Sequence, residues 1–193
     1  MLGVILAGGE NTRLPVLKGF MEIGGRPVIE RQVELMRGIF GRVAISANEP
    51  EIYFYLGAPV IGDIIKHAGP AGGILSALIG AQAEEVFVTA CDMPFVRPEL
   101  IRLIVSRKGG DAAVPVFNGR PEPLLAVYSR GMAGPLESAI SSGARGLRET
   151  LKKADVRYIE ETEVRRIDPE GVSFININTL DDLETAKQKE VLR

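Results

Sequence analysis

Residues 2 to 18, LGVILAGGENTRLPVLK, combine a short apolar run with a pair of glycines and two cationic side chains. Their apolar run has the length of a buried strand and breaks at Gly8 and Gly9 into a polar segment that carries Arg13 and Lys18. Glycine has no Cβ, so the backbone there can come close to a ligand, and α/β proteins bind ligands at the ends of their strands. The stretch indicates a nucleotide site, and the alternative on these residues alone is a plain turn.

Composition is that of an ordinary globular protein. The chain has 193 residues, 46% hydrophobic and 25% charged, and we expect one domain over residues 1–193. Its net charge of -2 and the lack of a block of like charges argue against nucleic acid or a membrane surface as the main partner. No targeting signal or membrane segment is visible, and a single cysteine, Cys91, fits a cytoplasmic protein.

Apolar runs alternate with helical patterns along the chain. Strands are expected near residues 4–6, 42–47, 85–90, 111–117, 124–128, 156–159 and 174–179, and helices near residues 28–40, 53–56, 74–82, 98–108, 132–141, 147–153 and 180–190. Residues 68–73 are expected to form a loop, and residues 160–166 a solvated edge. The spacing predicts a mostly parallel sheet between helices, with an antiparallel addition where the connection before residue 124 is short.

Polar residues at the ends of two predicted strands mark the candidate site. Asp92 follows the strand at residues 85–90, so its carboxylate is expected in the same crevice as Gly8. In the period-two pattern of residues 174–179, Asn176 and Asn178 project from one face. Thr179 with Asp182 three residues later predicts a capping box for the last helix.

Eight pieces in order then give a specific resemblance. They are LAGG at 6–9 with Arg13 and Lys18, GRPVIER at 25–31, SAN at 46–48, GPAGGILSAL at 69–78, TACDMPF at 89–95, EPLLAVYS at 122–129, GARGLRETL at 143–151 and FININTLDDL at 174–183. With these pieces the sequence resembles the molybdenum cofactor guanylyltransferases over essentially its whole length. The resemblance implies the three-layer α/β/α, Rossmann-like fold of the nucleotide-diphospho-sugar transferases.

The resemblance also implies a reaction: transfer of GMP from GTP to the phosphate of molybdopterin, with release of pyrophosphate and dependence on Mg²⁺. A phosphate oxygen is already a nucleophile, so the protein has to position it and neutralise charge. Because the acceptor is labile, transient protein partners are expected to hand it over.

Site residues carry over from the family by position. Nucleotide contacts are implied for Leu6, Ala7, Gly8, Gly9, Lys18, Asn48, Asp63 and Asp92; metal ligation for Asp92 and Asn178; triphosphate contacts for Arg13 and Lys18; and acceptor contacts for Arg145, Arg148 and Asn176. Glycine at position 8 goes with guanine in the family, and alanine there with cytidylyl relatives.

Two residues depart from the family's opening motif. Where relatives have glycine after Arg13-Met, and an acidic residue before the lysine, this chain has Pro15 and Leu17. Pro15 offers no backbone N–H to a phosphate, and Leu17 removes a charge. Two alternatives therefore stay open: a cytidylyl or other nucleotidyltransferase with a different phosphorylated acceptor, and a nucleotide-binding module without catalysis. Neither His67 nor Cys91 is assigned a chemical role.

Overall fold

A computed structural model of the chain describes residues 1–8, 18–143 and 146–191. The strands in this part are β1 (Leu2–Leu6), β2 (Glu22–Ile23), β3 (Arg26–Pro27), β4 (Val43–Ser46), β5 (Val60–Ile61), β6 (Glu85–Ala90), β7 (Ala112–Phe117), β8 (Arg120–Pro121), β9 (Leu125–Ser129) and β10 (Val156–Ile159). The α-helices are α1 (Val28–Arg37), α2 (Gly69–Gly80), α3 (Pro98–Ser106), α4 (Ala133–Ser141), α5 (Leu147–Leu151), α6 (Glu161–Ile167) and α7 (Leu180–Val191). Short 3-10 helices are η1 (Lys18–Phe20), η2 (Pro50–Leu56), η3 (Arg130–Met132) and η4 (Val172–Phe174). None of the helices described is long and apolar enough to cross a membrane.

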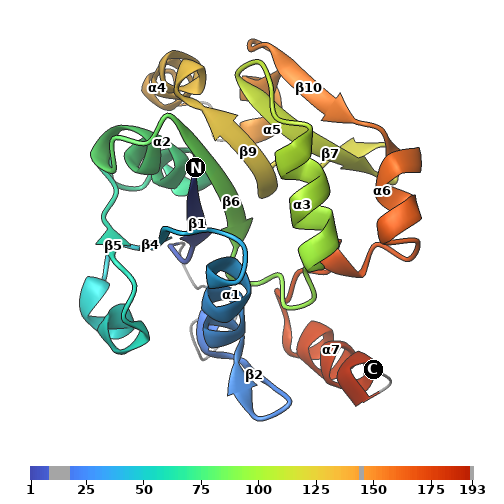
Figure 1. Ribbon diagram of the computed structural model, residues 1–193. Helices are drawn as coiled ribbons and strands as arrows, with labels where there is room; N and C mark the ends of the chain where they lie inside the picture. Colours follow the sequence, from blue (N-terminus) through green and yellow to red (C-terminus); the bar gives the residue numbers. More distant parts are fainter. Residues whose placement is uncertain (9–17, 144–145, 192–193) are drawn as a thin grey trace.

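The main sheet has β1 in its interior. Its order among the described residues is β10-β7-β9-β6-β1-β4-β5, with β8 paired to β7 (Figure 1). Strands β6, β1, β4 and β5 run parallel to one another, and Val4 of β1 lies between Val88 and Ala44. Strand β9 runs antiparallel to both β6 and β7, while β10 is parallel to β7. This confirms the predicted mostly parallel sheet with an antiparallel addition.

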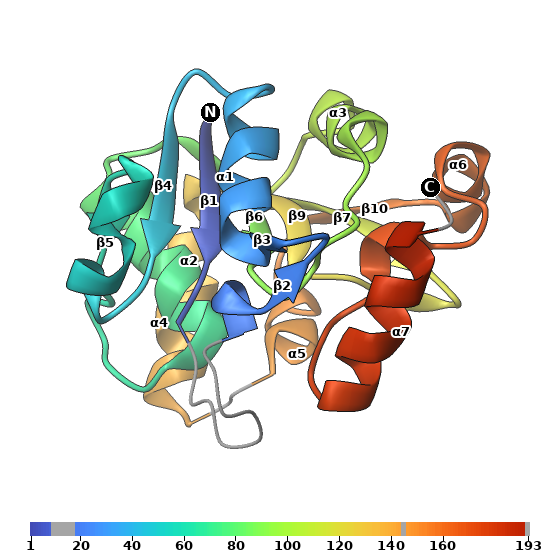
Figure 2. The ribbon, with the colours of Figure 1, turned by 90° about the horizontal axis from the view of Figure 1, so that it is seen from below.

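Helices cover both faces of the sheet. Ile5 of β1 belongs to a core shared with α1 and α3, whereas Val4 and Leu6 belong to a core shared with α2 and α4. Figure 1 shows α1 and α3 on one side of the sheet and α2 and α4 on the other, and Figure 2 shows the paired strands β1 and β4 lengthwise. A strand buried on both faces is apolar at nearly every position, which explains the run with which the chain begins. The three-layer α/β/α architecture is confirmed.

Helix α2 corrects the prediction of a loop at residues 68–73, because the helix begins at Gly69. Two glycines of this helix, Gly72 and Gly73, allow it to pack closely against the residues around it. A Cβ on Gly73 would lie 2.7 Å from Ser46 Oγ and 3.0 Å from Leu6 Cδ2, and a Cβ on Gly72 would lie 2.8 Å from Ala68 Cβ. Glycines that let a helix approach strands are not distinguishable, in sequence, from glycines that form a turn.

The strand predicted for residues 174–179 is also wrong. Phe174 ends η4, and the residues that follow belong to no strand. Ile177 is fully buried, and its N–H donates to the backbone carbonyl of Asp92 at 2.9 Å. The alternation therefore reflects one anchored, extended segment, whose hydrogen bond to the chain after β6 is too isolated to make a ladder.

Residues 160–166, predicted to be a solvated edge, lie largely in helix α6. Val164 is fully buried against the sheet, and the charged residues around it form ion pairs: Glu163 with Arg107, and Glu161 with Arg165. Two apolar residues of this helix, Val164 and Ile167, contact the core, and its 7 residues are too few to show a clear helical period in the sequence.

The last helix is capped as predicted. Asp182 Oδ2 accepts the N–H of Asn178 at 3.0 Å and of Thr179 at 2.9 Å, and Thr179 Oγ1 accepts the N–H of Asp182. Helix α7 then packs against β2 through a small third core, formed by Met21, Ile23, Val28, Phe95, Val172, Ile177 and Ala186. This core holds the C-terminal segment against the edge where β6 ends.

The close approach of α2 predicts a sharp difference between two glycines of that helix. Gly73→Ala should lower the free energy of unfolding by about 1–3 kcal/mol, because the added methyl group overpacks the contact with Ser46 and Leu6. Gly80→Ala is the matched control, since a Cβ there would lie 3.9 Å from Ile61 Cγ2, an ordinary contact. Urea unfolding measures both, and an equal loss of stability in the two variants would contradict this packing.

The cap of α7 predicts a contribution to acid stability. The pKa of Asp182 lies below its ordinary value of 3.8, first because the N–H of Asn178 donates to the ionised carboxylate and then because Thr179 does. A lowered folded-state pKa means that the contribution is complete above that ordinary value and is lost as the pH falls through the folded-state pKa. Asp182→Asn should therefore reduce stability at neutral pH, and the difference from the parent should shrink in acid. Urea unfolding over a pH series tests this, with Glu184→Gln in the same helix as control.

Candidate active site

Four neighbouring parallel strands present polar or glycine residues at one edge of the sheet. Two positions beyond the ends of β5, β4, β1 and β6 stand Asp63, Asn48, Gly8 and Asp92 respectively. Parallel strands place their carboxyl ends on the same edge, so residues separated by more than eighty positions become neighbours along one line. All four were predicted site residues, and the structure brings them to a common edge.

Asp92 and Lys18 form the centre of this edge. Lys18 Nζ lies 3.0 Å from Asp92 Oδ2 and donates to Asn178 Oδ1 at 2.5 Å. The Asp92 side chain is 14% exposed and that of Lys18 is 32% exposed, so water screens this contact only partly. Residues from the beginning, middle and end of the chain therefore meet at one ammonium group.

Among the described residues, one oxygen of Asp92 has no hydrogen-bond partner. Its Oδ1 is buried without a hydrogen bond among the described residues, while Oδ2 is held by Lys18. An unsatisfied buried carboxylate oxygen costs free energy unless a ligand completes it. Asp92 Oδ1 and the neighbouring Asn178 Oδ1 are both oxygen donors of the kind that Mg²⁺ prefers.

This donor set fits a metal ion shared with a substrate, and does not form a closed protein cage. No cluster of three or more His, Cys, Asp or Glu side chains able to hold a metal exists within residues 1–8, 18–143 and 146–191. Magnesium bound to nucleotide phosphates keeps several waters and takes only one or two protein ligands. The residues present match that second arrangement.

Asn48 and Asp63 form a reciprocal pair across the ends of β4 and β5. Asn48 Nδ2 donates to Asp63 Oδ2 at 2.9 Å, and the Asp63 N–H donates to Asn48 Oδ1 at 2.9 Å. Each side chain thereby fixes the other. The pair presents an orientated amide and carboxylate at the β4–β5 end of the edge.

The backbone after β1 is held from both sides. The Ala7 N–H donates to the Ser46 carbonyl at 2.9 Å, and the Cys91 N–H donates to the Leu6 carbonyl at 3.0 Å. Tyr53 adds a hydrogen bond from its hydroxyl to the Ala7 carbonyl at 3.2 Å, a contact that sequence reasoning missed because nothing in the pattern of η2 indicates it. Among the described residues, a Cβ on Gly8 would meet only Ser46 O, at 3.9 Å, so their packing does not require glycine there.

Several predicted residues lie outside the described residues: Gly9, Arg13 and Arg145, together with the two departures Pro15 and Leu17. Of the other predicted acceptor contacts, Asn176 donates to the Phe174 carbonyl at 3.3 Å, a local bond that does not join it to Lys18. Arg148 donates from Nε to the Pro121 carbonyl at 2.9 Å, and its Nη2 lies 3.7 Å from Glu122 Oε1. The structure does not bring Asn176 and Arg148 together.

Cys91 sits beside Asp92 without being a nucleophile. Its side chain is buried, and burial, followed by the charge of Asp92, raises the pKa of the thiol to about 12. The thiol is therefore protonated at neutral pH, and only the thiolate attacks. His67 is exposed and lies outside the cluster around Lys18.

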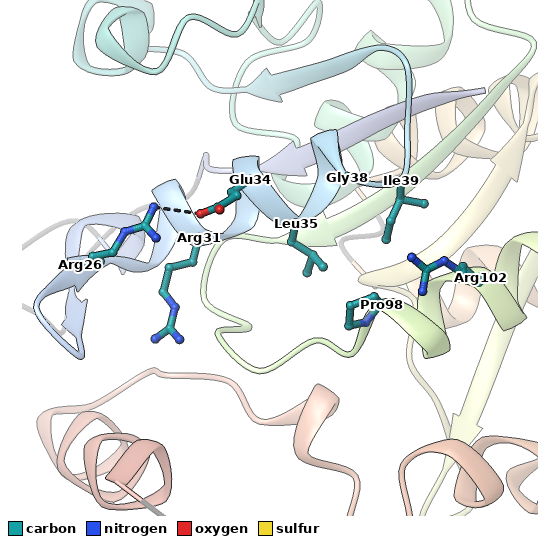
Figure 3. A pocket seen from close by; sticks show the side chains of 8 residues that line it. All are labelled: Arg26, Arg31, Glu34, Leu35, Gly38, Ile39, Pro98 and Arg102. Atoms are coloured by element: carbon teal, nitrogen blue, oxygen red, sulfur yellow. Dashed lines mark hydrogen bonds and ion pairs between the residues drawn. The ribbon is translucent and has the colours of Figure 1, made fainter. Parts of the chain in front are cut away.

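A hollow of about 520 Å³ lies elsewhere, between α1 and α3 (Figure 3). It is lined by Arg26, Arg31, Glu34, Leu35, Gly38, Ile39, Pro98 and Arg102. Arg26 and Glu34 form an ion pair at 3.0 Å on its rim, as the dashed line marks. None of the predicted site residues lines this hollow.

Sequence comparison shows which known proteins this chain is similar to. The family model described as the MobA-like NTP transferase domain matches residues 3–159. A probable molybdenum cofactor guanylyltransferase from Pelotomaculum thermopropionicum is 36% identical, covering 96% of this chain and 91% of that protein. A molybdenum cofactor guanylyltransferase from Desulfosudis oleivorans is also 36% identical, covering 96% of this chain and 93% of that protein.

A solved structure is similar over the whole chain. The crystal structure of molybdopterin-guanine dinucleotide biosynthesis protein A from Archaeoglobus fulgidus has a TM-score of 0.87, with 32% sequence identity and 100% of both chains covered. The sequence match, the sheet order and the residues gathered at the ends of its strands lead to one conclusion: the chain belongs to the MobA-like family of nucleotidyltransferases.

Proposed function

We propose that this protein transfers GMP from GTP to the terminal phosphate of molybdopterin and releases pyrophosphate. The observation that carries the proposal is the cluster of Asp92, Lys18 and Asn178 at the edge where the central strands end, with one buried Asp92 oxygen unpartnered within the part of the chain that the structure describes. Family membership supports the reaction class, and the printed names of the relatives support the guanylyl group and the molybdenum cofactor.

The chemistry requires positioning and charge neutralisation. The acceptor phosphate oxygen attacks the α-phosphorus of GTP, the bond from that phosphorus to the bridging oxygen breaks, and pyrophosphate leaves with the electron pair. Because the nucleophile is already anionic, no general base is needed. Lys18, with Arg13 from outside the described residues, supplies positive charge for the triphosphate and for the departing pyrophosphate.

Asp92 and Asn178 are the residues that would hold a Mg²⁺ ion, through Asp92 Oδ1 and Asn178 Oδ1. The ion would supply charge stabilisation on the phosphate oxygens. Lys18 now donates to Asp92 Oδ2 and to Asn178 Oδ1, so it keeps these two acceptors orientated. Binding of GTP would let the ammonium group turn toward the phosphates and free the Asn178 oxygen.

The nucleotide lies, in this proposal, along the parallel half of the edge. The backbone from Leu6 to Gly9 borders the base and the phosphates, and the Asn48–Asp63 pair contacts the nucleoside. Glycine at position 8 favours guanine, and its place is not dictated by packing. A cytidylyltransferase is the second candidate, because Gly8 is the one described residue to which the choice between the two bases is assigned. Arg148 and Arg145 remain proposed contacts of the acceptor phosphate, and handover partners remain expected.

Nucleotide preference provides the first test. With Mg²⁺ present, GTP should bind at least tenfold more tightly than CTP or ATP, measured by calorimetry, because the edge beyond Gly8 is assigned to guanine. Pyrophosphate release with molybdopterin should follow the same order across the four nucleoside triphosphates. Equal binding of all four, or preference for CTP, would refute the guanylyl assignment. Binding without pyrophosphate release would favour the non-catalytic alternative.

Asp92→Asn provides the second test. The substitution keeps the size of the side chain and removes the charge that would face the metal, so kcat for pyrophosphate release should fall by about 10²–10³-fold. The melting temperature should stay within a few degrees, because the backbone contact between Asp92 O and Ile177 N is retained. Glu137→Gln on the exposed surface of α4 is the control and should leave kcat unchanged. Full activity of Asp92→Asn would remove this residue from the reaction.

A further inference from the structure

Glu122 continues the line of site residues into the antiparallel part of the sheet. Strand β9 pairs with β6 so that Leu125 lies opposite Thr89, and the residues just before β9 therefore extend past the end of β6. That is the edge where Asp92 stands. The Glu122 N–H donates to the Pro115 carbonyl of β7 at 2.9 Å, which anchors its backbone there.

The carboxylate of Glu122 is partly shielded and weakly satisfied. Its side chain is 24% exposed, and its contact among the described residues is Arg148 Nη2 at 3.7 Å from Oε1, longer than a hydrogen bond. Arg148 itself is fixed by the bond from its Nε to the Pro121 carbonyl. Burial raises the pKa of Glu122, and the charges of Arg148 and Arg120 oppose that rise. The site thus has a carboxylate whose oxygens can still accept hydrogen bonds.

An acidic side chain at this place needs a reason, because the proposed reaction brings two phosphorylated substrates together. A carboxylate facing a phosphate would repel it. A carboxylate is instead complementary to two adjacent N–H donors, which it accepts in a bidentate way. The 2-amino-4-oxo ring of a pterin has such an edge, formed by N3–H and the 2-amino group.

We propose that Glu122 determines acceptor specificity by accepting hydrogen bonds from the aminopyrimidinone edge of the pterin. This inference rests on the proposed function and adds the group that recognises the acceptor ring. Glu122 is in this inference a specificity residue.

Guanine has the same donor edge, so the position of Glu122 matters. Strand β9 is separated from β4, whose end carries Asn48, by two intervening strands, β6 and β1. At about 4.8 Å per strand, this separation is roughly 14 Å, too far for one base to contact both. Asp92 and Lys18 lie between them. The order of the strands therefore assigns the Asn48 side to the nucleotide and the Glu122 side to the acceptor.

The test compares two ring analogues as competitors of molybdopterin: pterin, and lumazine, which carries a carbonyl in place of the 2-amino group. The parent protein should bind pterin about 10- to 100-fold more tightly, because lumazine turns an acceptor toward the carboxylate. In Glu122→Gln this preference should fall to within about threefold of unity, since the amide can donate to the carbonyl of lumazine. The KM for molybdopterin should rise about tenfold, with the KM for GTP unchanged.

Controls separate recognition from folding. Glu149→Gln, on α5 next to Arg148, removes an exposed carboxylate that pairs with Lys152 and should keep the pterin preference. If Glu122→Gln does not fold, Glu122→Asp keeps the charge and shortens the reach, and it should lower the preference for pterin at least tenfold. Melting temperatures accompany each variant.

Two results would overturn the inference: an unchanged preference for pterin in the folded Glu122 variants, or a loss of discrimination between GTP and ITP, which lacks the guanine 2-amino group. The second result would place Glu122 on the nucleotide side. Failure of the proposed function is a different outcome, in which the parent protein itself releases no pyrophosphate from GTP and molybdopterin.

Discussion

The contact of Lys18 with Asp92 and Asn178 is the constraint on which the rest of this structure depends. Each residue comes from a different part of the chain, and each requires its own support: η1 for Lys18, the end of β6 for Asp92, and the segment before α7 for Asn178. The hydrogen bond from Ile177 to the Asp92 carbonyl and the small core beneath α7 hold the last of these in register. The C-terminal helix therefore contributes directly to the geometry of the site.

The order of the strands determines what each part of the edge can do. Each strand of the parallel half ends at this edge with its carboxyl end, so the residue two positions after the strand lies at the edge. Strand β9 has the opposite direction and reaches the same edge with its amino end, which brings the residues before it, including Glu122, to the line. Asp92 stands at the boundary between the two halves, where a donor and an acceptor substrate would have to meet.

Residues that follow strands were predictable, and residues that depend on packing were not. Asp92 and Gly8 follow buried apolar runs, so their common edge could be inferred from strand length and from the rule for parallel sheets. Gly72 and Gly73 suggested a loop, although they belong to a helix whose contact with Ser46 is a tertiary property. Asn176 looked equivalent to Asn178 by alternation, and only the three-dimensional path shows that it bonds locally to Phe174. Contacts such as Tyr53 with Ala7 leave no periodic signal at all.

One buried oxygen of Asp92 lacks a hydrogen bond among the described residues, and the proposed ligand explains why this costly arrangement persists. A buried carboxylate oxygen without a hydrogen bond costs about 1–3 kcal/mol or more, so a protein selected for stability alone would have satisfied it. The described residues instead satisfy only Oδ2, through an ammonium group that also donates to Asn178. Lys18 prevents the carboxylate from being an isolated buried charge, and the free oxygen keeps one direction open. A site that must bind a charged group and then release it needs this partial satisfaction, because a fully satisfied carboxylate would have no free acceptor to offer.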